Sequence, residues 1–301
     1  MLHKGSRLIE SYLLFLKSSR LSDQTIRSYR CIVEKFLAEN PGAVNFTYSD
    51  ILSYLDGLNK FHFSKPTRQL KLIAIKKFYD FLIEAEYRDD HPCKTIFVKT
   101  NSKRNIIQAD LFSMAELDSL LEREERYEHL KAKNQVVISF LIYQGLLPGE
   151  IVNLKLHHVD LDSGSVYVNA GRLLTARRLP LLERQEEILS EYIHTHRKRM
   201  QLKGENEFLL LNFQGSPLRV DDVNYLVQTM KDRFPGRNLN CKSIRDSVIS
   251  YWMNTKKIPP EQVQLLAGHR WISSTLRYKQ IRIKEIRETL NKIFPLEKKN
   301  T

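Results

Sequence analysis

Residues Gln264–Ile281 read QLLAGHRWISSTLRYKQI and contain the most informative spacing in the chain. His269 and Tyr278 stand nine residues apart in this stretch. A phenol can attack an electrophile, and an imidazole can bind an anion or move a proton. The stretch therefore holds a candidate nucleophile with a candidate partner close by in the sequence.

Cations stand upstream of this stretch at positions where they can join it. The segment CKSIRD puts Lys242 and Arg245 three residues apart, hence on one face of a helix. Arg172 follows Gly171 directly, in a turn expected between strands. Attack on a phosphodiester passes through a doubly negative transition state, which fixed cations stabilise. The set therefore suits phosphodiester chemistry.

Each of these residues also has an ordinary structural interpretation. A tyrosine in a basic segment is usually a half-buried packing residue, as Tyr278 would be here. A Lys-x-x-Arg pair is usually a solvated helix face, and a lone histidine is usually a hydrogen-bonded structural residue. Only the ordered set favours a catalytic site over these alternatives.

The composition points to a polyanionic partner. The chain has 301 residues, 42% hydrophobic and 28% charged, and a formal net charge of +13. This length suggests two folded domains. The charge favours nucleic acid, although a generally basic protein with solvated cationic faces is the alternative.

The cysteines and the apolar runs exclude several classes. Only three cysteines occur, Cys31, Cys93 and Cys241, too few and too far apart for a disulfide framework or a zinc knuckle. No apolar run approaches the ~18 residues of a membrane span, and the N-terminus lacks a signal-peptide cleavage site. We expect a cytoplasmic protein that neither crosses a membrane nor binds a metal.

The N-terminal part, residues 1–96, is predicted to be a compact helical domain. Apolar residues recur three and four positions apart from Leu8 to about Ala85. Ser22 is a favourable N-cap for the second helix. We expect helices over residues 5–19, from Ser22 to just before Pro41, over 48–58, and from Pro66 or Thr67 to 86.

Residues 97–109 are predicted to be an extended linker, and residues 110–301 a second domain. A helix should open at Ser113, where Glu116 completes a capping box. The segment NQVVISFLIYQGLL is apolar on nearly all faces, as a central buried helix would be. We expect two or three short strands within residues 157–182, with His157 and His158 facing opposite ways, and helices from Glu183 onward. The fold class is therefore mainly α with one small β-sheet.

Nearly the whole chain resembles the tyrosine recombinases, the phage-integrase and Xer-like family of site-specific DNA recombinases. The segments LSDQTIRSYRCIVEKFLAEN and TRQLKLIAIKKFYDFLIEAE are similar to the family's SAM-like core-binding domain. The remainder resembles its α+β catalytic domain, most specifically in LLAGHRWISSTLRYKQI. The resemblance implies DNA cutting and rejoining through a 3′-phosphotyrosyl intermediate, without a cofactor.

The resemblance also assigns roles to residues. Tyr278 would be the nucleophile, His269 would bind the scissile phosphate, and Arg245 would be the second catalytic arginine. Lys242 takes the histidine position of the family's His-x-x-Arg box, where a lysine also occurs. Arg172 falls where the family has a hairpin lysine, the general acid, and a pKa above ~12 makes arginine a poor proton donor. The adjacent Arg177 or Arg178 would partly compensate.

The segment GLLPGEIVNL departs from the family at one catalytic position. Gly145, Leu146 and Glu150 are in register with the family's Gly-Leu-Arg-x-x-Glu-Leu box, but Leu147 replaces the first catalytic arginine. A leucine cannot donate to a phosphate oxygen, and losing one guanidinium should cost ~3 to 5 kcal/mol, or ~10² to 10⁴ in rate. Pro148 also alters the turn that would present this side chain.

Two functional hypotheses therefore stay open. The chain is an active recombinase with a divergent site, or a catalytically weak or inactive DNA-binding member that serves as a structural or regulatory partner of another recombinase. Both need double-stranded DNA, and the resemblance implies a homo- or hetero-tetramer on it. The segment IRIKEIRETLNKIF should form a last helix, which would dock on a neighbouring protomer or on its own domain.

The residues expected to contact DNA outside the catalytic set are basic. In the family a helix of the core-binding domain lies on the major groove, and the fourth helix here is rich in lysine. A solvated basic face of an ordinary amphipathic helix is the alternative. The expected DNA-binding residues are Lys65, Arg68, Lys71, Lys76, Arg177 and Arg178.

Overall fold

The chain divides into two units, Met1–Arg104 and Asn105–Thr301. The computed structural model describes residues 2–99, 111–125, 127–200 and 206–280. Each unit has a hydrophobic core of its own. Most of the predicted linker and the whole predicted last helix, residues 281–294, lie outside the described residues, so both stay predictions.

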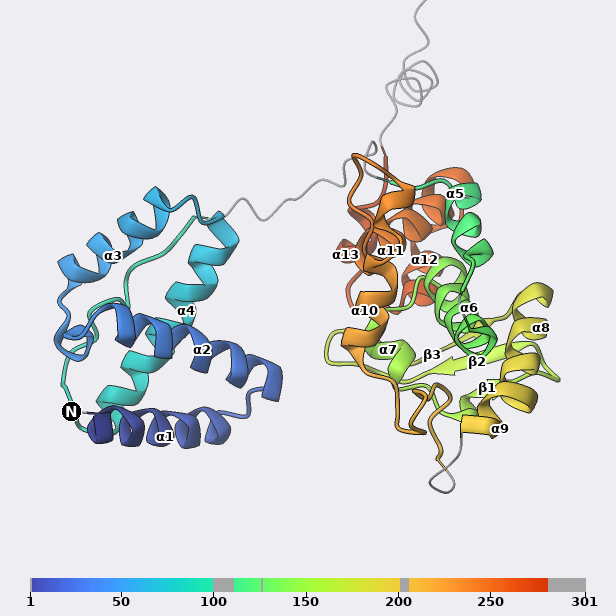
Figure 1. Ribbon diagram of the computed structural model, residues 1–301. Coiled ribbons are helices and arrows are strands. Elements are labelled where there is room, and N and C mark those ends of the chain that lie inside the picture. Colours follow the sequence, from blue (N-terminus) through green and yellow to red (C-terminus); the bar gives the residue numbers. More distant parts are fainter. Residues whose placement is uncertain (1, 100–110, 126, 201–205, 281–301) are drawn as a thin grey trace, which may run out of the picture. The chain divides into compact units, whose positions relative to one another are not determined.

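The first unit is a bundle of four helices, as predicted (Figure 1). Ser22 caps the second helix by accepting a hydrogen bond from the Thr25 backbone N–H. The apolar stripes meet in a core that includes Phe36, Phe78 and Tyr79. The helices are α1 (Leu2–Ser18), α2 (Asp23–Glu39), α3 (Tyr48–Lys60) and α4 (Lys65–Glu84).

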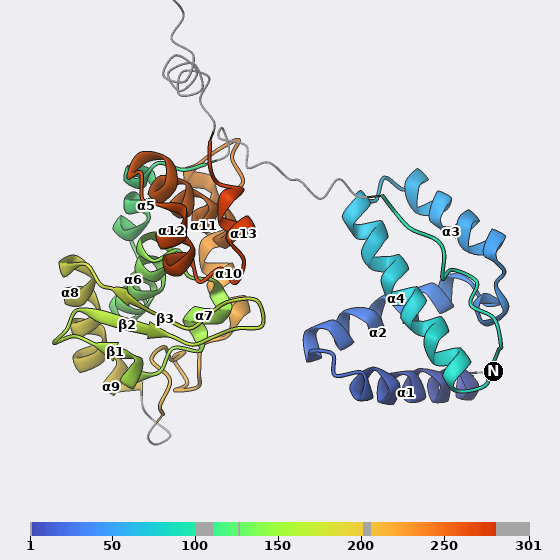
Figure 2. The same ribbon diagram turned by 180° about the vertical axis from the view of Figure 1, so that it is seen from behind.

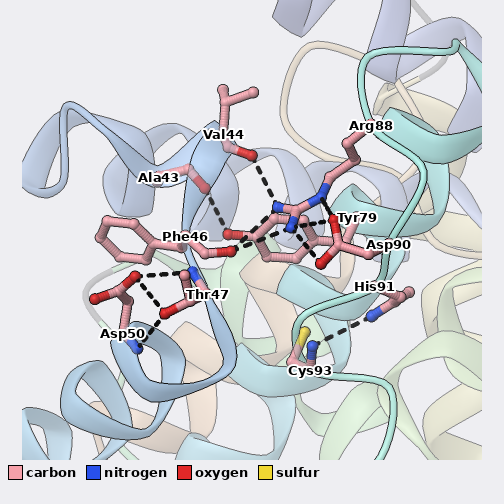
Figure 3. A network of polar contacts seen from close by, with 10 residues as sticks. All are labelled: Ala43, Val44, Phe46, Thr47, Asp50, Tyr79, Arg88, Asp90, His91 and Cys93. Atoms are coloured by element: carbon pink, nitrogen blue, oxygen red, sulfur yellow. Dashed lines mark hydrogen bonds and ion pairs between the residues drawn. The ribbon is translucent and has the colours of Figure 1, made fainter.

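A polar network holds the connection between α2 and α3 against the end of α4 (Figure 3). The Tyr79 hydroxyl on α4 donates to the Ala43 carbonyl at 2.5 Å. Arg88, just past α4, donates to the Val44 carbonyl at 2.9 Å and forms an ion pair with Asp90. Backbone carbonyls in this connection thus accept hydrogen bonds from side chains at and just past the end of α4.

The second unit is built around the apolar helix predicted from NQVVISFLIYQGLL, here α6 (Glu128–Tyr143). Val136, Val137 and Phe140 are fully buried, and α6 packs against α8 and α11 in the interior of the unit (Figure 1). None of the described helices is long and apolar enough to cross a membrane. The other helices are α5 (Met114–Asp118), α7 (Pro148–Val152), α8 (Glu183–Glu191), α9 (Arg197–Met200), α10 (Val220–Gln228), α11 (Cys241–Ser250), α12 (Pro260–Ala267) and α13 (Ile272–Leu276).

The small sheet has three antiparallel strands in the order β1-β2-β3 (Figure 2). These strands are β1 (Val159–Asp160), β2 (Ser165–Val168) and β3 (Arg177–Pro180). Val166 pairs with Leu179, and both are buried in the core of the unit. The loop joining β2 to β3, residues 169–176, carries Arg172. The predicted fold class, mainly α with a small sheet, is confirmed.

Two local predictions are wrong. The chain between α9 and α10 is not helical over 206–219, because Phe208 bridges to Lys155 and Leu211 bridges to Pro217, which requires extended backbone. His158 is in a 3₁₀ turn, Leu156–His158, and not in a strand. Its ring therefore lies 4.5 Å from the ring of the preceding histidine instead of facing away from it.

Candidate active site

Arg245 is held in the interior of the second unit by backbone carbonyls. Its helix α11 begins at the N-cap Asn240, whose side chain accepts from the Ser243 backbone N–H at 2.9 Å. The guanidinium donates from Nη1 to the Gly145 carbonyl at 2.7 Å and from Nη2 to the Ala267 carbonyl at 2.6 Å. Arg245 is only 5% exposed, and this burial lowers its pKa. The cation is thus fixed between the turn after α6 and the end of α12.

Glu150 joins Arg245 to a second guanidinium. Its Oε1 accepts from Arg177 Nη1 at 2.7 Å, and its Oε2 lies 3.8 Å from Arg245 Nη1. Arg177 Nε donates to the Leu266 carbonyl at 2.8 Å. Arg177 Nη2 is buried and has no hydrogen-bond partner among the described residues. One carboxylate therefore holds two arginines from β3 and α11 next to each other.

The end of α12 is shaped to admit Arg177. Gly268 has φ +68°, a left-handed conformation that favours glycine, and a Cβ there would collide with the Arg177 guanidinium. The Gly268 carbonyl accepts from the Thr175 backbone N–H at 2.9 Å, and Leu174 pairs with His269 in an isolated bridge. The loop between β2 and β3 is thereby tied to the segment that carries His269.

His269 and Tyr278 lie together, as their spacing suggested. Their ring centroids are 6.0 Å apart with an interplanar angle of 17°. His269 Nδ1 is 2.9 Å from the hydroxyl of Thr275, which is fully buried. Burial, then the charges of Arg245 and Arg177, lower the pKa of His269 to about 4. The imidazole is therefore neutral at pH 7.

The Tyr278 phenol is docked inside its own unit. Its hydroxyl donates to Asp246 Oδ1 at 2.7 Å, and its backbone carbonyl accepts from Asn254 Nδ2 at 2.8 Å. The ring packs against a small apolar cluster that includes Ile249 and Val263. Burial raises the pKa of Tyr278, with the Asp246 charge as a second cause. The candidate nucleophile is thus protonated at rest.

Leu147 stands at the edge of this group, and its side chain contributes no donor to it. Its backbone N–H donates to Glu150 Oε2 at 2.9 Å, which closes the first turn of α7. Its side chain lines a cavity of about 450 Å³ together with Gly171 and Leu174 from the loop between β2 and β3. No group of three or more His, Cys, Asp or Glu residues in the described parts of the chain is arranged to hold a metal ion.

Two comparisons of sequence identify the family. Residues 111–285, more than half of the chain, match the family described as "Phage integrase family". The chain belongs to the phage integrase family. Residues 9–86 match its "Phage integrase, N-terminal SAM-like domain". The tyrosine recombinase XerC of Staphylococcus carnosus is 25% identical over 300 residues, which cover 98% of this chain and 99% of the relative.

Solved structures of a recombinase and an integrase share this fold. The XerH site-specific recombinase bound to a palindromic difH substrate, in a post-cleavage complex, matches with a TM-score of 0.69 and 17% identity, over 88% of this chain and 79% of that one. A lambda integrase dimer bound to a COC′ core site matches with a TM-score of 0.67 and 15% identity, over 92% and 99%. Site-specific recombination of DNA is the function that membership of the family supports.

Not all of the residues predicted for the integrase site are brought together. Arg245, His269 and Tyr278 meet, while Lys242 is exposed on α11 and Arg172 is exposed on the loop after β2. Arg178 is exposed and donates to the Ser165 hydroxyl at 2.9 Å. The structure places no described contact between these three cations and the phenol. Their roles in catalysis or DNA binding stay predictions.

The residues expected to bind DNA differ in how freely they present their charge. Lys65 is exposed at the start of α4. Lys71 lies 4.4 Å from the centre of the Phe63 ring, and Lys76 donates to the Lys94 carbonyl at 2.9 Å. Two arginines of the predicted set are less available: Arg68 has a buried Nε, and Arg177 is inside the second unit.

Sequence reasoning missed Asp246 and the part that Glu150 plays. Asp246 is the residue after Arg245, and neighbours on a helix point about 100° apart, so no helical spacing links it to the same site. Its partner Tyr278 is 32 residues away. Glu150 belongs to the box quoted from the sequence, but nothing in the box shows that it binds two arginines.

Proposed function

We propose that this chain cuts and rejoins duplex DNA with Tyr278 as the nucleophile. The observation that carries the proposal is the meeting of Tyr278, His269 and Arg245 in one unit, with the phenol and imidazole rings stacked and the Arg245 charge acting on both groups. Attack by the phenol on a phosphodiester would leave the 3′ phosphate on Tyr278 and release a 5′ hydroxyl. The covalent bond conserves the energy needed for rejoining, so no cofactor is required.

The remaining donors of Arg245 suit the phosphate. An arginine has five N–H donors, and the backbone carbonyls of Gly145 and Ala267 each take one from Arg245. A guanidinium held in this way pays little reorganisation when charge develops on the phosphorane. His269, neutral at rest, would donate a hydrogen bond to a phosphate oxygen.

Arg177 is the residue that we propose offsets the missing arginine at position 147. It places a second guanidinium beside Arg245, on the same carboxylate. Arg172 then remains the candidate for binding the DNA strand near the leaving oxygen. The bridge between Leu174 and His269 ties the loop that carries Arg172 to the site. The Leu147 side chain offers no donor to the phosphate. Cleavage should therefore be slower than in a site that has an arginine at this position as well as Arg245.

We further propose that several chains act together on DNA. Exchange of strands between two duplexes requires every strand to be cut, and each chain offers one Tyr278. A tetramer, of this chain alone or with another recombinase, satisfies that requirement. The basic residues of α4, Lys65 and Lys71 among them, would hold the phosphates of one half-site.

A nicked duplex tests the proposed cleavage. The full chain first selects its binding site from random duplexes. Nicks are then placed at successive positions beside the expected cleavage point. When the protein cuts, the short fragment between the cut and the nick diffuses away, so the protein cannot rejoin the strand. Cleavage traps the protein on DNA as a band that survives denaturing electrophoresis. We expect this band with the native chain and its loss in Tyr278→Phe, with DNA affinity unchanged.

The opposite outcome has a clear meaning. Tight binding to the selected site with no covalent band at any nick position would refute cleavage by Tyr278 and favour a DNA-binding partner of another recombinase. A band that persists in Tyr278→Phe would move the nucleophile elsewhere.

A further inference from the structure

Asp246 is a second carboxylate in the site, besides the Glu150 that holds Arg245 and Arg177. It follows Arg245 on α11, and its Oδ1 accepts the hydroxyl of Tyr278 at 2.7 Å. The Tyr278 backbone is fixed independently, by the Asn254 amide on its carbonyl. The segment therefore has an anchor besides this carboxylate, and the carboxylate contacts the one atom that would attack DNA.

We propose that Asp246 is a catalytic residue that accepts the phenol proton of Tyr278 during attack on phosphorus. The inference rests on the proposed function, since it needs a Tyr278 that cleaves DNA. In the step, the Tyr278 Oη–H bond breaks and the proton moves to Asp246 Oδ1 while an Oη–P bond forms. The P–O5′ bond breaks, and the 5′ oxygen leaves with the bonding electrons and takes a proton from solvent.

The other groups around the phenol are poorly suited to accept this proton. Arg245 and Arg277 act on the phenol through their charges, and a guanidinium has no acceptor. The His269 ring is stacked on the phenol ring at 17°, so it faces the ring and not the O–H direction. Its Nδ1 is engaged with Thr275. Among the described groups that contact this hydroxyl, Asp246 is the anionic acceptor.

The chemistry of the step requires an acceptor at this place. A phenol has an ordinary pKa of about 10, and the burial of Tyr278 raises it further, so the resting hydroxyl holds its proton. As the oxygen bonds to phosphorus, the proton becomes strongly acidic, and a carboxylate then suffices as base. The transfer also neutralises Asp246 as the phosphorane gains its second negative charge, so the site loses a repulsive anion at that moment.

The test is a comparison of Asp246→Asn with the native full chain on the nicked duplex. Asparagine keeps the size of the side chain and an oxygen that accepts the hydrogen bond, but it cannot accept the proton. The scissile position carries a bridging sulfur in place of the 5′ oxygen, because a thiolate leaves without a proton donor and the rate then reports the base alone. Tyr278→Phe is the blank.

We expect Asp246→Asn to form the covalent band about 10²-fold more slowly at pH 7, with unchanged or tighter DNA binding. Its rate should then rise about tenfold per pH unit above 7, because hydroxide must remove the proton. A rate within about threefold of native would overturn the inference alone, leaving cleavage by Tyr278 intact. No band from the native chain would overturn the proposed function, and this inference with it.

A second measurement does not depend on cleavage. The chain has 13 tyrosines, and isotope labelling at their Cζ atoms gives an NMR signal that shifts when a phenol ionises. Tyr278→Phe identifies the signal of interest. We expect its titration to move to lower pH in Asp246→Asn, because a negative charge at the hydroxyl has been removed. A titration unaffected by this substitution would show that Asp246 does not contact the phenol, and would overturn the inference.

Discussion

Arg177 and Glu150 form an ion pair inside the second unit, with Nη1 2.7 Å from Oε1 and the two side chains only 5% and 7% exposed. The pair connects β3 to α7, and the same carboxylate reaches Arg245. It is therefore the point at which the sheet, the turn after α6 and the candidate catalytic arginine meet.

Removing Arg177 should destabilise the second unit strongly. Arg177→Ala leaves Glu150 buried without its main partner, and we expect a loss of ~3 to 5 kcal/mol in the free energy of unfolding. Both tryptophans, Trp252 and Trp271, belong to this unit, so their fluorescence during urea unfolding measures it. Lys155→Ala is the control, because its pair with Glu207 is 31% and 58% exposed and is worth no more than ~1 kcal/mol. Equal losses in the two variants would contradict the importance of burial.

Leu147→Arg should increase cleavage. The new guanidinium would enter the cavity lined by Gly171 and Leu174 and add a donor for the phosphate. We expect covalent adduct to form ~10²-fold faster on the nicked duplex. Leu147→Met, which adds no donor, is the matched control and should leave the rate unchanged. An arginine variant no faster than the methionine variant would show that Arg172 or the turn at Pro148 is limiting.

DNA binding should weaken steeply with salt, because basic side chains displace counterions from phosphates. Lys65 is exposed at the start of α4. Lys65→Ala should reduce the magnitude of the slope of log affinity against log salt by about one, and by the same amount whichever DNA sequence is used. Lys17→Ala, exposed at the end of α1, is the control and should not change the slope. Titrations by fluorescence anisotropy at several salt concentrations measure both, and identical slopes would remove Lys65 from the interface.

Gly268→Ala should disrupt the site beyond its effect on the backbone. A non-glycine residue in the left-handed region costs ~1 to 2 kcal/mol, and here the new Cβ also collides with the Arg177 guanidinium. Gly236→Ala has the same backbone strain, with φ +82° and no atom within 4 Å of the new Cβ. We expect both variants to lose stability, and only Gly268→Ala to lose adduct formation. Adduct formation by Gly268→Ala at the Gly236→Ala rate would mean that Arg177 is not needed.

His269 should make the second unit less stable in mild acid. Its pKa is lowered to about 4 from an ordinary 6.5, so the unfolded chain binds this proton first as the pH falls. The contribution of His269 to stability is complete above pH 6.5 and is lost as the pH falls toward 4. Urea unfolding across this range should show the decline, and His269→Gln should flatten it. A native profile no steeper than that of the variant would contradict a neutral His269.

Local patterns were enough to predict much of this fold. The Ser22 cap, the Ser113 capping box and the apolar run of α6 depend on residues close together in the chain, so their physics is visible in the sequence. The non-helical segment 206–219 was missed, because its shape depends on pairing with Lys155, which lies far away in the chain.

The sequence by itself determined the family, and it predicted two domains and the candidate site residues Arg245, His269 and Tyr278, because these follow from local spacing and motif order. Only the tertiary structure decided which groups surround them. Glu150 joining two arginines and Asp246 holding the phenol both require contacts across many residues. Such contacts are set by how α7, α11 and β3 pack around α6, and no periodicity along the chain records that packing.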